Sequence, residues 1–255
     1  MSTVLITGCS SGFGLHAART FLERGWSVIA TMRVRNEALL TPSANLRVLP
    51  LDVTDAASIA RVVETVGPID ALVNNAGVGM LGVLEGTPIP VVRAMFEINT
   101  FGPIALTQAF LPSFRARRSG VIVNVSSSVT LRPLPMLATY TASKAALNAF
   151  TESLDIELAP LGVRARLVLP GQSPETPFGP NARAWSEQHG VRVPEAYAAF
   201  AEQVVARVTR TDGGAARPVT HAVDVTDAIW RAVTDPACPI IQPAGADAVA
   251  LAAPH

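Results

Sequence analysis

The sequence predicts an α/β protein built on a doubly wound parallel sheet with helices on both faces. Short apolar runs such as Val4–Thr7 and Val121–Val125 alternate with longer segments of helical periodicity, which is the pattern of strand–helix–strand units. Turn-forming residues follow these runs, for example after the run Ala71–Val73. The 255 residues contain no linker, repeat or low-complexity tract, so a single domain, residues 1–255, is expected.

Composition argues against several classes of function. The 20 basic and 20 acidic residues give a net charge of zero without a basic stripe, which disfavours nucleic acid and anionic membranes as partners. No apolar stretch approaches the roughly 18 residues of a membrane span, and no signal peptide is visible before Val4, so a cytoplasmic location is expected. Cys9 and Cys238 suit a reducing compartment and have no metal-ligand cluster beside them, so no metal is expected.

A glycine-rich turn links the first strand to a helical pattern that runs from Leu15 to Arg24. Its glycines permit a tight turn and close approach of the backbone to a pyrophosphate, and the helix N-terminus favours the negative charge. The alternative is a plain turn with a capping serine. We therefore predict dinucleotide binding by six residues of this turn: Gly8, Ser10, Ser11, Gly12, Phe13 and Gly14.

The second strand, Ser27–Thr31, predicts the choice of cofactor. An NAD site usually places an acidic residue at this strand end, whereas an NADP site accommodates the 2′-phosphate with an arginine. Here Arg33 follows the strand and no acid precedes Glu37, so Arg33 is the candidate phosphate partner, helped by Ser10 or Ser11. The alternative is that Arg33 and Arg35 are solvated loop charges. NADP(H) is the preferred cofactor, and NAD(H) is possible.

Two further strand ends are expected to reach the same ligand-binding edge of the sheet. The third strand, Leu46–Leu51, ends at Asp52-Val53, after which Thr54 or Asp55 could cap a helix that runs to Val66. The fourth strand runs into Asn74-Asn75-Ala76-Gly77. For the two asparagines, ordinary turn chemistry is the alternative to a ligand contact.

A long helical region follows, opened by Thr87 as cap and Pro88 as the first helical residue. Inside it, Asn99 and the pair Gly102-Pro103 predict a kink or an opened hydrogen bond. Its apolar character fits either a second subunit or the core of the same chain.

Tyr140 and Lys144 are the strongest candidates for chemistry. They lie one turn apart on the same face of a helix that ends near Pro160 and Gly162. A cation within about 4–6 Å lowers the pKa of a phenol from its usual value of about 10. The pair could therefore transfer a proton at an alcohol or carbonyl oxygen. Taken alone, the pattern also occurs on surface helices.

The last third of the chain is expected to form a substrate pocket. Gln172 to about Arg192 is rich in Pro, Gly and polar residues, which is typical of a flexible lid, and the lid with its following helix spans 172–210. The other expected elements are a strand Arg164–Leu169 leading into Pro170-Gly171, helices over Pro194–Arg210 and Asp224–Thr234, and a short strand Ile240–Ile241.

Taken in order, these motifs resemble the short-chain dehydrogenase/reductase family in its NAD(P)(H)-dependent branch. The matching features are Thr7-Gly8 to Gly14, Asp52-Val53, Asn74 to Gly77, Asn99, a serine thirteen before the tyrosine, Tyr140 with Lys144, and Pro170-Gly171. The resemblance implies a Rossmann-like sheet of about seven parallel strands, hydride transfer at a carbonyl or carbinol carbon, and a homodimer or homotetramer.

The resemblance also implies the catalytic roles. Ser127 would hold the substrate oxygen and Tyr140 would exchange its proton. Lys144 would bind the nicotinamide ribose and lower the pKa of Tyr140, and Asn99 would anchor a water that links Lys144 to solvent.

The remaining cofactor contacts follow from the same resemblance. Asp52 would contact the adenine, Val53 would contribute its backbone, and Asn74, Ala76 and Gly77 would line the adenosine side. Pro170, Gly171 and Thr176 would lie at the nicotinamide, although Thr176 stands one residue further from the Pro-Gly pair than is usual in the family.

The motifs are most similar to those of hydroxysteroid and retinol dehydrogenase-like members. Apolar residues near the site, such as Val129, Leu131 and Met136, indicate a hydrophobic ketone, aldehyde or secondary alcohol as substrate, and an NADP site favours carbonyl reduction. The main alternative is a non-catalytic NAD(P)-binding regulator, which would commonly have lost one of the four catalytic residues. A nucleotide-sugar epimerase is disfavoured by the glycine spacing and the chain length.

Overall fold

The computed structural model describes residues 1–209 and 218–253, which form one seven-stranded parallel sheet of order β3-β2-β1-β4-β5-β6-β7. The strands are β1 Thr3–Ile6, β2 Ser27–Met32, β3 Leu46–Pro50, β4 Ala71–Asn74, β5 Gly120–Val125, β6 Val163–Pro170 and β7 Ile241–Ala244. This confirms the predicted fold class. The strand order reverses between β1 and β4, and the crevice beyond the carboxyl ends of such strands is where ligands bind in doubly wound sheets.

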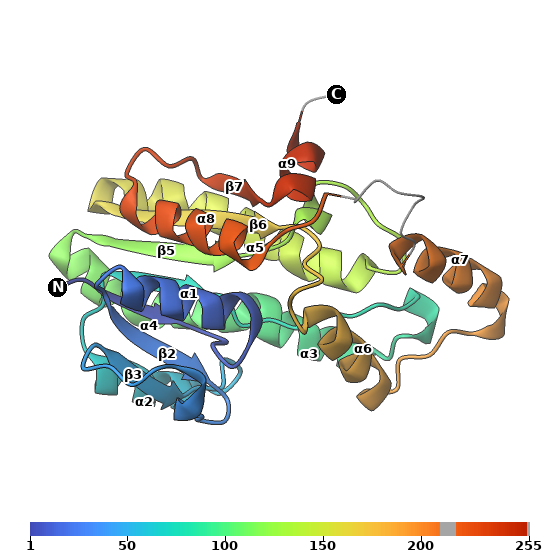
Figure 1. Ribbon diagram of the computed structural model, residues 1–255, viewed down its shortest axis with the longest axis horizontal. Helices are drawn as coiled ribbons and strands as arrows, with labels where there is room; N and C mark the ends of the chain where they lie inside the picture. The colour runs from blue at the N-terminus through green and yellow to red at the C-terminus, as the bar shows by residue number, and fades with distance from the viewer. Residues whose placement is uncertain (210–217, 254–255) are drawn as a thin grey trace.

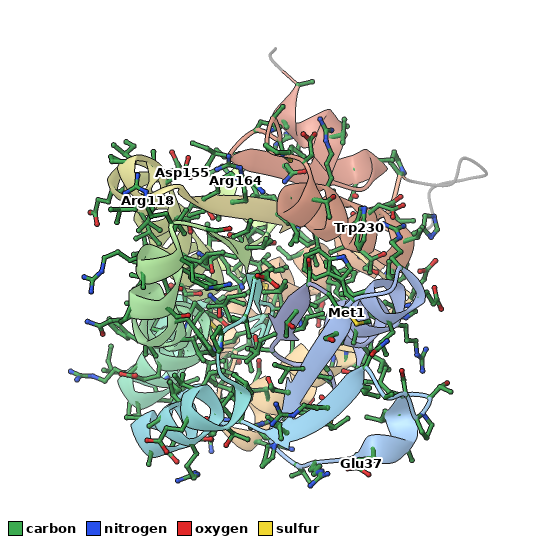
Figure 2. The ribbon with its side chains drawn as sticks, turned by 90° about the vertical axis from the view of Figure 1, so that its left-hand side faces the viewer. Met1, Glu37, Arg118, Asp155, Arg164 and Trp230 are labelled. Carbon is green, nitrogen blue, oxygen red and sulfur yellow. The ribbon has the colours of Figure 1, made fainter. Side chains whose placement is uncertain are left out.

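Helices cover both faces of the sheet (Figure 1). They are α1 Gly12–Glu23, α2 Ala56–Val66, α3 Ile89–Phe96, α4 Gly102–Arg117, α5 Ala138–Leu158, α6 Phe178–Gln188, α7 Ala198–Thr209, α8 Ala222–Thr234 and α9 Ala246–Ala252. In Figure 2, Trp230 of α8 and Arg118 at the end of α4 lie on opposite sides of the sheet. Within the described ranges, no helix has the length and apolar character that crossing a bilayer requires.

Alternating side chains of the strands build two separate cores. Val4 and Ile6 of β1 pack with Phe21 of α1 in one core, whereas Leu5 packs with Phe110 of α4 in the other. Successive strand residues point to opposite faces, and both faces here are covered, so the strands read as nearly continuous apolar runs.

Helix boundaries follow the sequence signals with one correction. Asp55 caps α2 by accepting a hydrogen bond from the Ala57 backbone N–H at 2.9 Å. Of the two predicted caps, Thr54 and Asp55, the structure therefore selects Asp55. The prediction that Thr87 caps α3 was wrong, because Pro88 occupies that position. The Thr87 hydroxyl instead donates to the carbonyl oxygen of Val83 at 2.8 Å and closes the preceding turn.

The expected opening in the long helical region is confirmed as a π-helical turn, Glu97–Phe101, between α3 and α4. Such turns are frequent at functional sites because they change the direction and bonding of the backbone. Leu106, Phe110 and Phe114 of α4 belong to the core of the same chain.

The segment 172–192, predicted to be a flexible lid, contains the helix α6. The segment packs against residues 79–86: a side-chain carbon added to Gly79 would lie 2.7 Å from the Phe178 ring, and one added to Gly82 would lie 2.6 Å from Val191. The absence of side chains at these glycines allows this close contact. Helices near 194–209 and 222–234 are confirmed, and Arg210, the expected end of the first, lies outside the described residues.

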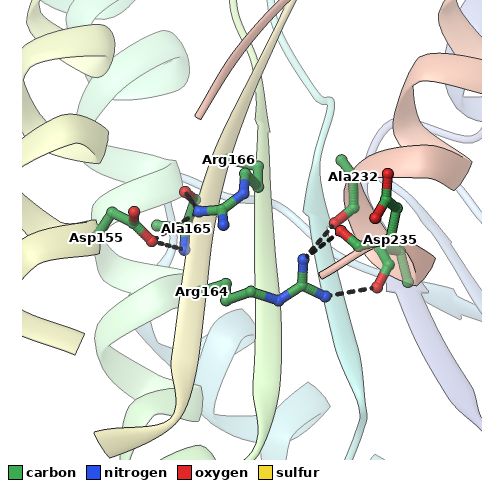
Figure 3. A network of polar contacts seen from close by, with 7 residues as sticks. Asp155, Arg164, Ala165, Arg166, Ala232 and Asp235 are labelled. Carbon is green, nitrogen blue, oxygen red and sulfur yellow. Dashed lines mark hydrogen bonds and ion pairs between the residues drawn. The ribbon is translucent and has the colours of Figure 1, made fainter. Parts of the chain in front are cut away.

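Two arginines secure the amino-terminal half of β6 (Figure 3). β7 pairs with β6 only from Leu167 onward, so the preceding residues need other partners. Asp155 of α5 accepts from the Ala165 backbone N–H at 2.9 Å and from Arg166 at 2.8 Å. Arg164 donates to carbonyl oxygens at the end of α8, including that of Val233 at 2.9 Å, where a helix leaves its carbonyls unpaired.

Candidate active site

Ser127 and Tyr140 meet beyond the carboxyl end of β5. Ser127 caps a short 3-10 turn, Ser128–Thr130, and α5 begins at Ala138, so that Tyr140 stands in its first turn. The Tyr140 phenol shares a hydrogen bond with the Ser127 side chain. Both residues are buried, with Tyr140 only 6% exposed. The two groups expected to hold the reacting oxygen are therefore in direct contact.

Lys144, one helical turn further, is the only lysine of the chain. Its ammonium is buried and donates to the carbonyl oxygen of Val125, the last residue of β5, at 2.9 Å. A side-chain carbon added to Gly77 would lie 3.4 Å from the Lys144 Nζ and 3.1 Å from the Asn99 Oδ1. Gly77 thus brings the turn that follows β4, residues 75–77 (the β4 turn), close to both Lys144 and Asn99.

Asn99 lies in the π-helical turn and is fully buried. Its amide accepts from the Val78 backbone N–H and donates to the Val78 carbonyl, both at 2.9 Å, and also donates to Ser143 Oγ at 3.1 Å. Ser143 in turn donates to the Tyr140 carbonyl oxygen at 2.8 Å. Ser143 therefore links Asn99 to α5, a role for which a serine in the middle of a helix gives no sequence signal.

The expected lowering of the tyrosine pKa by Lys144 is wrong for this structure. Burial raises the pKa of Tyr140 to about 12, and the hydrogen bond to Ser127 only partly opposes it. Burial also lowers the pKa of Lys144 to about 8. Both shifts have the same cause, since a buried site disfavours the charged form of either group. At neutral pH, Tyr140 is therefore a neutral phenol with a proton to donate.

The glycine turn and the β4 turn are joined through Thr7. Its hydroxyl accepts hydrogen bonds from the backbone N–H groups of Asn75 and Ala76, both at 2.9 Å. Gly8 has φ +73°, and an added side-chain carbon there would lie 2.9 Å from Ala76 Cα. At Gly14 an added carbon would lie 2.4 Å from the Gly8 carbonyl oxygen. Both positions therefore require glycine.

The start of α1 suits a pyrophosphate. Ser11 is the N-cap residue with extended backbone and makes no side-chain cap bond, and the first turn contains no acidic side chain. Because the first backbone N–H groups of a helix lack helical partners, they can bind an anion here. Phe13, in the first turn of α1, is partly buried against the core.

Asp52, Val53 and Arg33 lie at the carboxyl ends of β3 and β2, as expected. Asp52 Oδ1 accepts from the backbone N–H and the hydroxyl of Thr54, which holds the pKa of Asp52 below its ordinary value, and the charge of Arg33 adds a smaller lowering. Arg33 is exposed. Val53 is buried, and a carbon added to Gly102 would lie 2.9 Å from its side chain.

Asn74 differs from the expectation that it lines the adenosine side. Its side chain is buried inside the sheet, where its amide donates to Asn124 Oδ1 at 2.8 Å and to Thr107 Oγ1 at 3.3 Å. Only the backbone of Asn74 is left to approach a cofactor. Asn124 in turn donates to Thr151 of α5 at 2.8 Å, so this chain of hydrogen bonds connects β4 and β5 to α5.

The segment after β6 returns to the glycine turn. Thr176 is buried, and a carbon added to Gly12 would lie 3.6 Å from Thr176 Cβ. Phe178 then places its ring 6.0 Å from the Tyr140 ring, measured between centroids. Met95 and Trp185 pack in the same apolar cluster as Tyr140. The Tyr140 ring is therefore packed against apolar side chains, whereas its hydroxyl contacts Ser127.

Glu175 and His221 form a latch between this segment and α8. The Glu175 carboxylate pairs with the His221 ring and accepts from the Ala222 backbone N–H at 3.2 Å. The bond to His221 holds the pKa of Glu175 below 4.5, with a small contribution from His16, and the same bond raises the pKa of His221 above 6.5, aided by Asp224. The glutamate part of the latch is lost as pH falls below 4.5, and the histidine part as pH rises through the raised pKa.

NMR titration of the histidine rings should therefore show His221 titrating above 6.5. Glu175→Gln should bring this pKa back toward 6.5, because the amide removes the negative charge that favours the protonated ring. Glu195→Gln, a change at an exposed residue of the same region, serves as the matched control. An unshifted His221 in the wild-type protein, or no effect of Glu175→Gln, would contradict the latch.

The family model for short chain dehydrogenases matches residues 2–187. The match covers more than half of the 255 residues, and this chain belongs to that family.

Among its curated relatives, retinol dehydrogenase 8 of Bos taurus is 40% identical over 181 residues, covering 66% of this chain and 58% of the relative. The 17-beta-hydroxysteroid dehydrogenase type 1 of Homo sapiens is 39% identical over 181 residues, covering 66% and 55%. The chain thus spans less than two thirds of the length of these relatives.

Solved structures cover nearly all of the chain. A short-chain dehydrogenase from Streptomyces avermitilis aligns with a TM-score of 0.81 and 31% identity, covering 98% of this chain and 91% of that one. A short chain dehydrogenase from Burkholderia cenocepacia J2315, solved in complex with NADP, aligns with a TM-score of 0.75 and 27% identity, again covering 98% and 91%. These similarities support a nicotinamide dinucleotide site in the same fold.

Proposed function

We propose that this protein is an oxidoreductase that prefers NADP(H) and interconverts an apolar ketone or aldehyde with its alcohol. The observation that carries the proposal is the contact between Ser127 and Tyr140, with Lys144 one turn away. This contact lies at the carboxyl edge of the sheet, where the glycine turn and the β4 turn are joined. The relatives named as retinol and hydroxysteroid dehydrogenases support the same type of reaction.

The cofactor would lie across this edge from the adenine end to the nicotinamide end. Asp52 would meet the adenine, Arg33 with Ser10 or Ser11 the 2′-phosphate, and the start of α1 the pyrophosphate. The other contacts would come from Gly8, Gly12, Gly14, the backbones of Phe13, Val53 and Asn74, and Ala76, Gly77, Pro170, Gly171 and Thr176.

Each catalytic side chain then has one task. The Ser127 hydroxyl holds the substrate oxygen, and Tyr140 donates its proton to that oxygen during reduction. The bound nicotinamide supplies the hydride, which is chemistry that no side chain provides. Lys144 binds the nicotinamide ribose, and a water anchored at Asn99 connects its ammonium to solvent. Tyr140, with its pKa raised to about 12, is protonated at neutral pH, as donation of a proton during carbonyl reduction requires.

The substrate class follows from the walls of the site. Met80, Met95 and Val129 pack around Tyr140, and α6 places Phe178 against the same ring. We assign substrate specificity to the segment from Gln172 through α7, which lies over this apolar region. Polar carbonyl compounds would leave their other polar groups unpaired there, so they should be poor substrates.

A panel of apolar ketones and aldehydes, including a steroid ketone and a retinal-type aldehyde, tests the function. Consumption of NADPH should be measured by absorbance with each compound and with polar keto acids as the comparison. Turnover of apolar carbonyls is the expected result. NADPH binding without turnover of any compound would instead support the non-catalytic regulator.

The cofactor preference is tested by Arg33→Ala. Removing a charge-assisted contact with the 2′-phosphate, worth about 1.5–3 kcal/mol, should weaken NADPH binding by roughly 10- to 100-fold and leave NADH binding nearly unchanged. Calorimetric titration of both nucleotides measures the difference. Arg35→Ala is the matched control, because Arg35 is also exposed but pairs with Glu37. Equal weakening of NADPH and NADH would show that Arg33 does not bind the phosphate.

We also propose that the protein assembles as a homodimer or homotetramer. Phe101, the last residue of the π-helical turn before α4, is 52% exposed, and Ile156 of α5 is 75% exposed. Helices α4 and α5 pack on the same face of the sheet as α2, and a second copy on that face would remove these two side chains from water.

A further inference from the structure

Two residues far from the catalytic motifs hold the backbone at the end of β6. The Thr220 hydroxyl accepts from the Gly171 backbone N–H at 2.9 Å, and Asp247 Oδ2 accepts from the Gln172 backbone N–H at 2.6 Å. Thr220 and Asp247 also bond to each other, with a 2.6 Å distance between Oγ1 and Oδ1. We refer to Thr220 and Asp247 as the β6 clamp.

The donors and acceptors of the clamp fit together. A hydroxyl has one hydrogen, which Thr220 can direct to Asp247 Oδ1 or to the Ala244 carbonyl oxygen at 3.0 Å, while its lone pair accepts from Gly171. An ionised carboxylate only accepts, and Asp247 accepts on both of its oxygens. The Thr220 backbone N–H completes the contact by donating to the Gln172 carbonyl oxygen at 2.9 Å.

Two glycines make room for these side chains. A carbon added to Gly171 would lie 2.1 Å from Asp247 Oδ2, and one added to Gly245, which has φ +99°, would lie 2.0 Å from Thr220 Oγ1. Neither position could carry a side chain without displacing the clamp. Thr220 is fully buried, so its hydrogen bonds are made away from water.

The clamp fixes the start of the segment that runs back to the glycine turn. Pro170 and Gly171 leave the sheet at the clamp, and five residues later Thr176 lies against Gly12. The other end is held by the latch between Glu175 and the start of α8. The path of residues 170–176 is thus set by the carboxyl-terminal part of the chain, namely α8, β7 and α9.

We propose that Thr220 and Asp247 are positioning residues that shape the nicotinamide end of the cofactor site. This inference rests on the proposed function, in which Pro170, Gly171 and Thr176 meet the nicotinamide. The clamp touches only the backbone of this segment and none of the residues assigned to the adenosine half. Its loss should therefore weaken recognition of the nicotinamide and leave recognition of the rest of the dinucleotide intact.

The test compares two ligands that differ only in the nicotinamide ring: NADP⁺ and 2′-phospho-ADP-ribose. Thr220→Val and Asp247→Ala should each raise the Kd of NADP⁺ by about tenfold, whereas the Kd of 2′-phospho-ADP-ribose should change less than twofold. Thr220→Ser, which keeps the hydroxyl, should bind NADP⁺ with the affinity of the wild-type protein. Asp227→Ala is the control, because Asp227 is a carboxylate of α8 that pairs with Arg24. Calorimetry gives both constants, and NAD⁺ with ADP-ribose provides the same comparison without the phosphate.

The outcomes separate the clamp from the proposed function. Equal weakening of both ligands would show a merely structural role and overturn the inference, as would unchanged NADP⁺ binding in both variants. Failure of the wild-type protein to bind either dinucleotide would overturn the proposed function together with the inference. If Asp247→Ala does not fold, Thr220→Val alone decides, because it removes one hydroxyl and conserves the shape of the side chain.

Discussion

Tyr140→Phe is expected to lower kcat for carbonyl reduction by about 10²–10⁴ because it removes the hydroxyl that we propose as the proton donor to the substrate oxygen. The ring remains, so its contact with Phe178 and its place in the apolar cluster are kept. NADPH affinity and melting temperature should therefore stay close to the wild-type values. Steady-state kinetics with the best carbonyl substrate, together with a cofactor titration, measure the effect.

The second tyrosine of the chain, Tyr197, provides a matched control. Its phenol bonds to Glu85 instead of Ser127, so Tyr197→Phe removes the same atom away from the reacting groups. It should retain kcat, and any effect should fall on KM. Near wild-type kcat in Tyr140→Phe would refute the assignment of Tyr140 as the proton donor.

Lys144→Met is expected to abolish most turnover while stabilising the cofactor-free protein at pH 7. Burial lowers the pKa of Lys144 from 10.5 to about 8. At about 1.4 kcal/mol per pKa unit, burying the ammonium costs roughly 3 kcal/mol. Loss of its hydrogen bond to Val125 should offset about 1 kcal/mol of the gain. The free energy of unfolding should thus rise by about 1–3 kcal/mol, and kcat should fall by about 10² or more.

The stabilisation expected for Lys144→Met should depend on pH. The neutral amine is favoured in the folded state, so the stability that it contributes is present above pH 10.5 and lost as pH falls through about 8. The difference between variant and wild type should be largest below pH 8 and shrink toward pH 10.5 in urea titrations. Because the chain has one lysine, NMR of isotope-labelled lysine gives a single side-chain signal that reports this pKa directly. A Lys144 pKa near 10.5 would contradict the account. So would a Lys144→Met variant that is less stable than the wild type by the same amount below pH 8 and near pH 10.5.

Most of the fold could be predicted from short sequence patterns. Three features can be recognised from a few consecutive residues: the glycine turn, the β4 turn, and the pair Tyr140 and Lys144. They depend only on the backbone freedom of glycine or on helical spacing. Parallel strands then bring their carboxyl ends together whatever the details of packing. The π-helical turn could also be expected, since Asn99 and Gly102-Pro103 interrupt an otherwise helical pattern.

Features that depend on distant partners could not be predicted. Asn74 looked like a turn residue, yet its amide is bonded to Asn124, fifty residues further along the chain. The pKa of Tyr140 is raised by burial, which depends on the whole fold, and only partly lowered by the hydrogen bond to Ser127. Helix α6 was not predicted, because Pro177 and Gly179 at its start are typical of a loop. Its packing against Gly79 depends on residues far apart in the sequence. The contact between Gln172 and Asp247 spans seventy-five residues and has no local signal at all.

A fluorescence titration of the unmodified protein with NADPH and, in parallel, with NADH tests the central claim most directly. It requires no knowledge of the substrate, and Trp185, packed in the cluster around Tyr140, provides a signal close to the proposed nicotinamide end. The expected result is saturable binding of both nucleotides, with NADPH bound more tightly. If neither nucleotide binds, the glycine turn is not a cofactor site and the proposed oxidoreductase function is wrong.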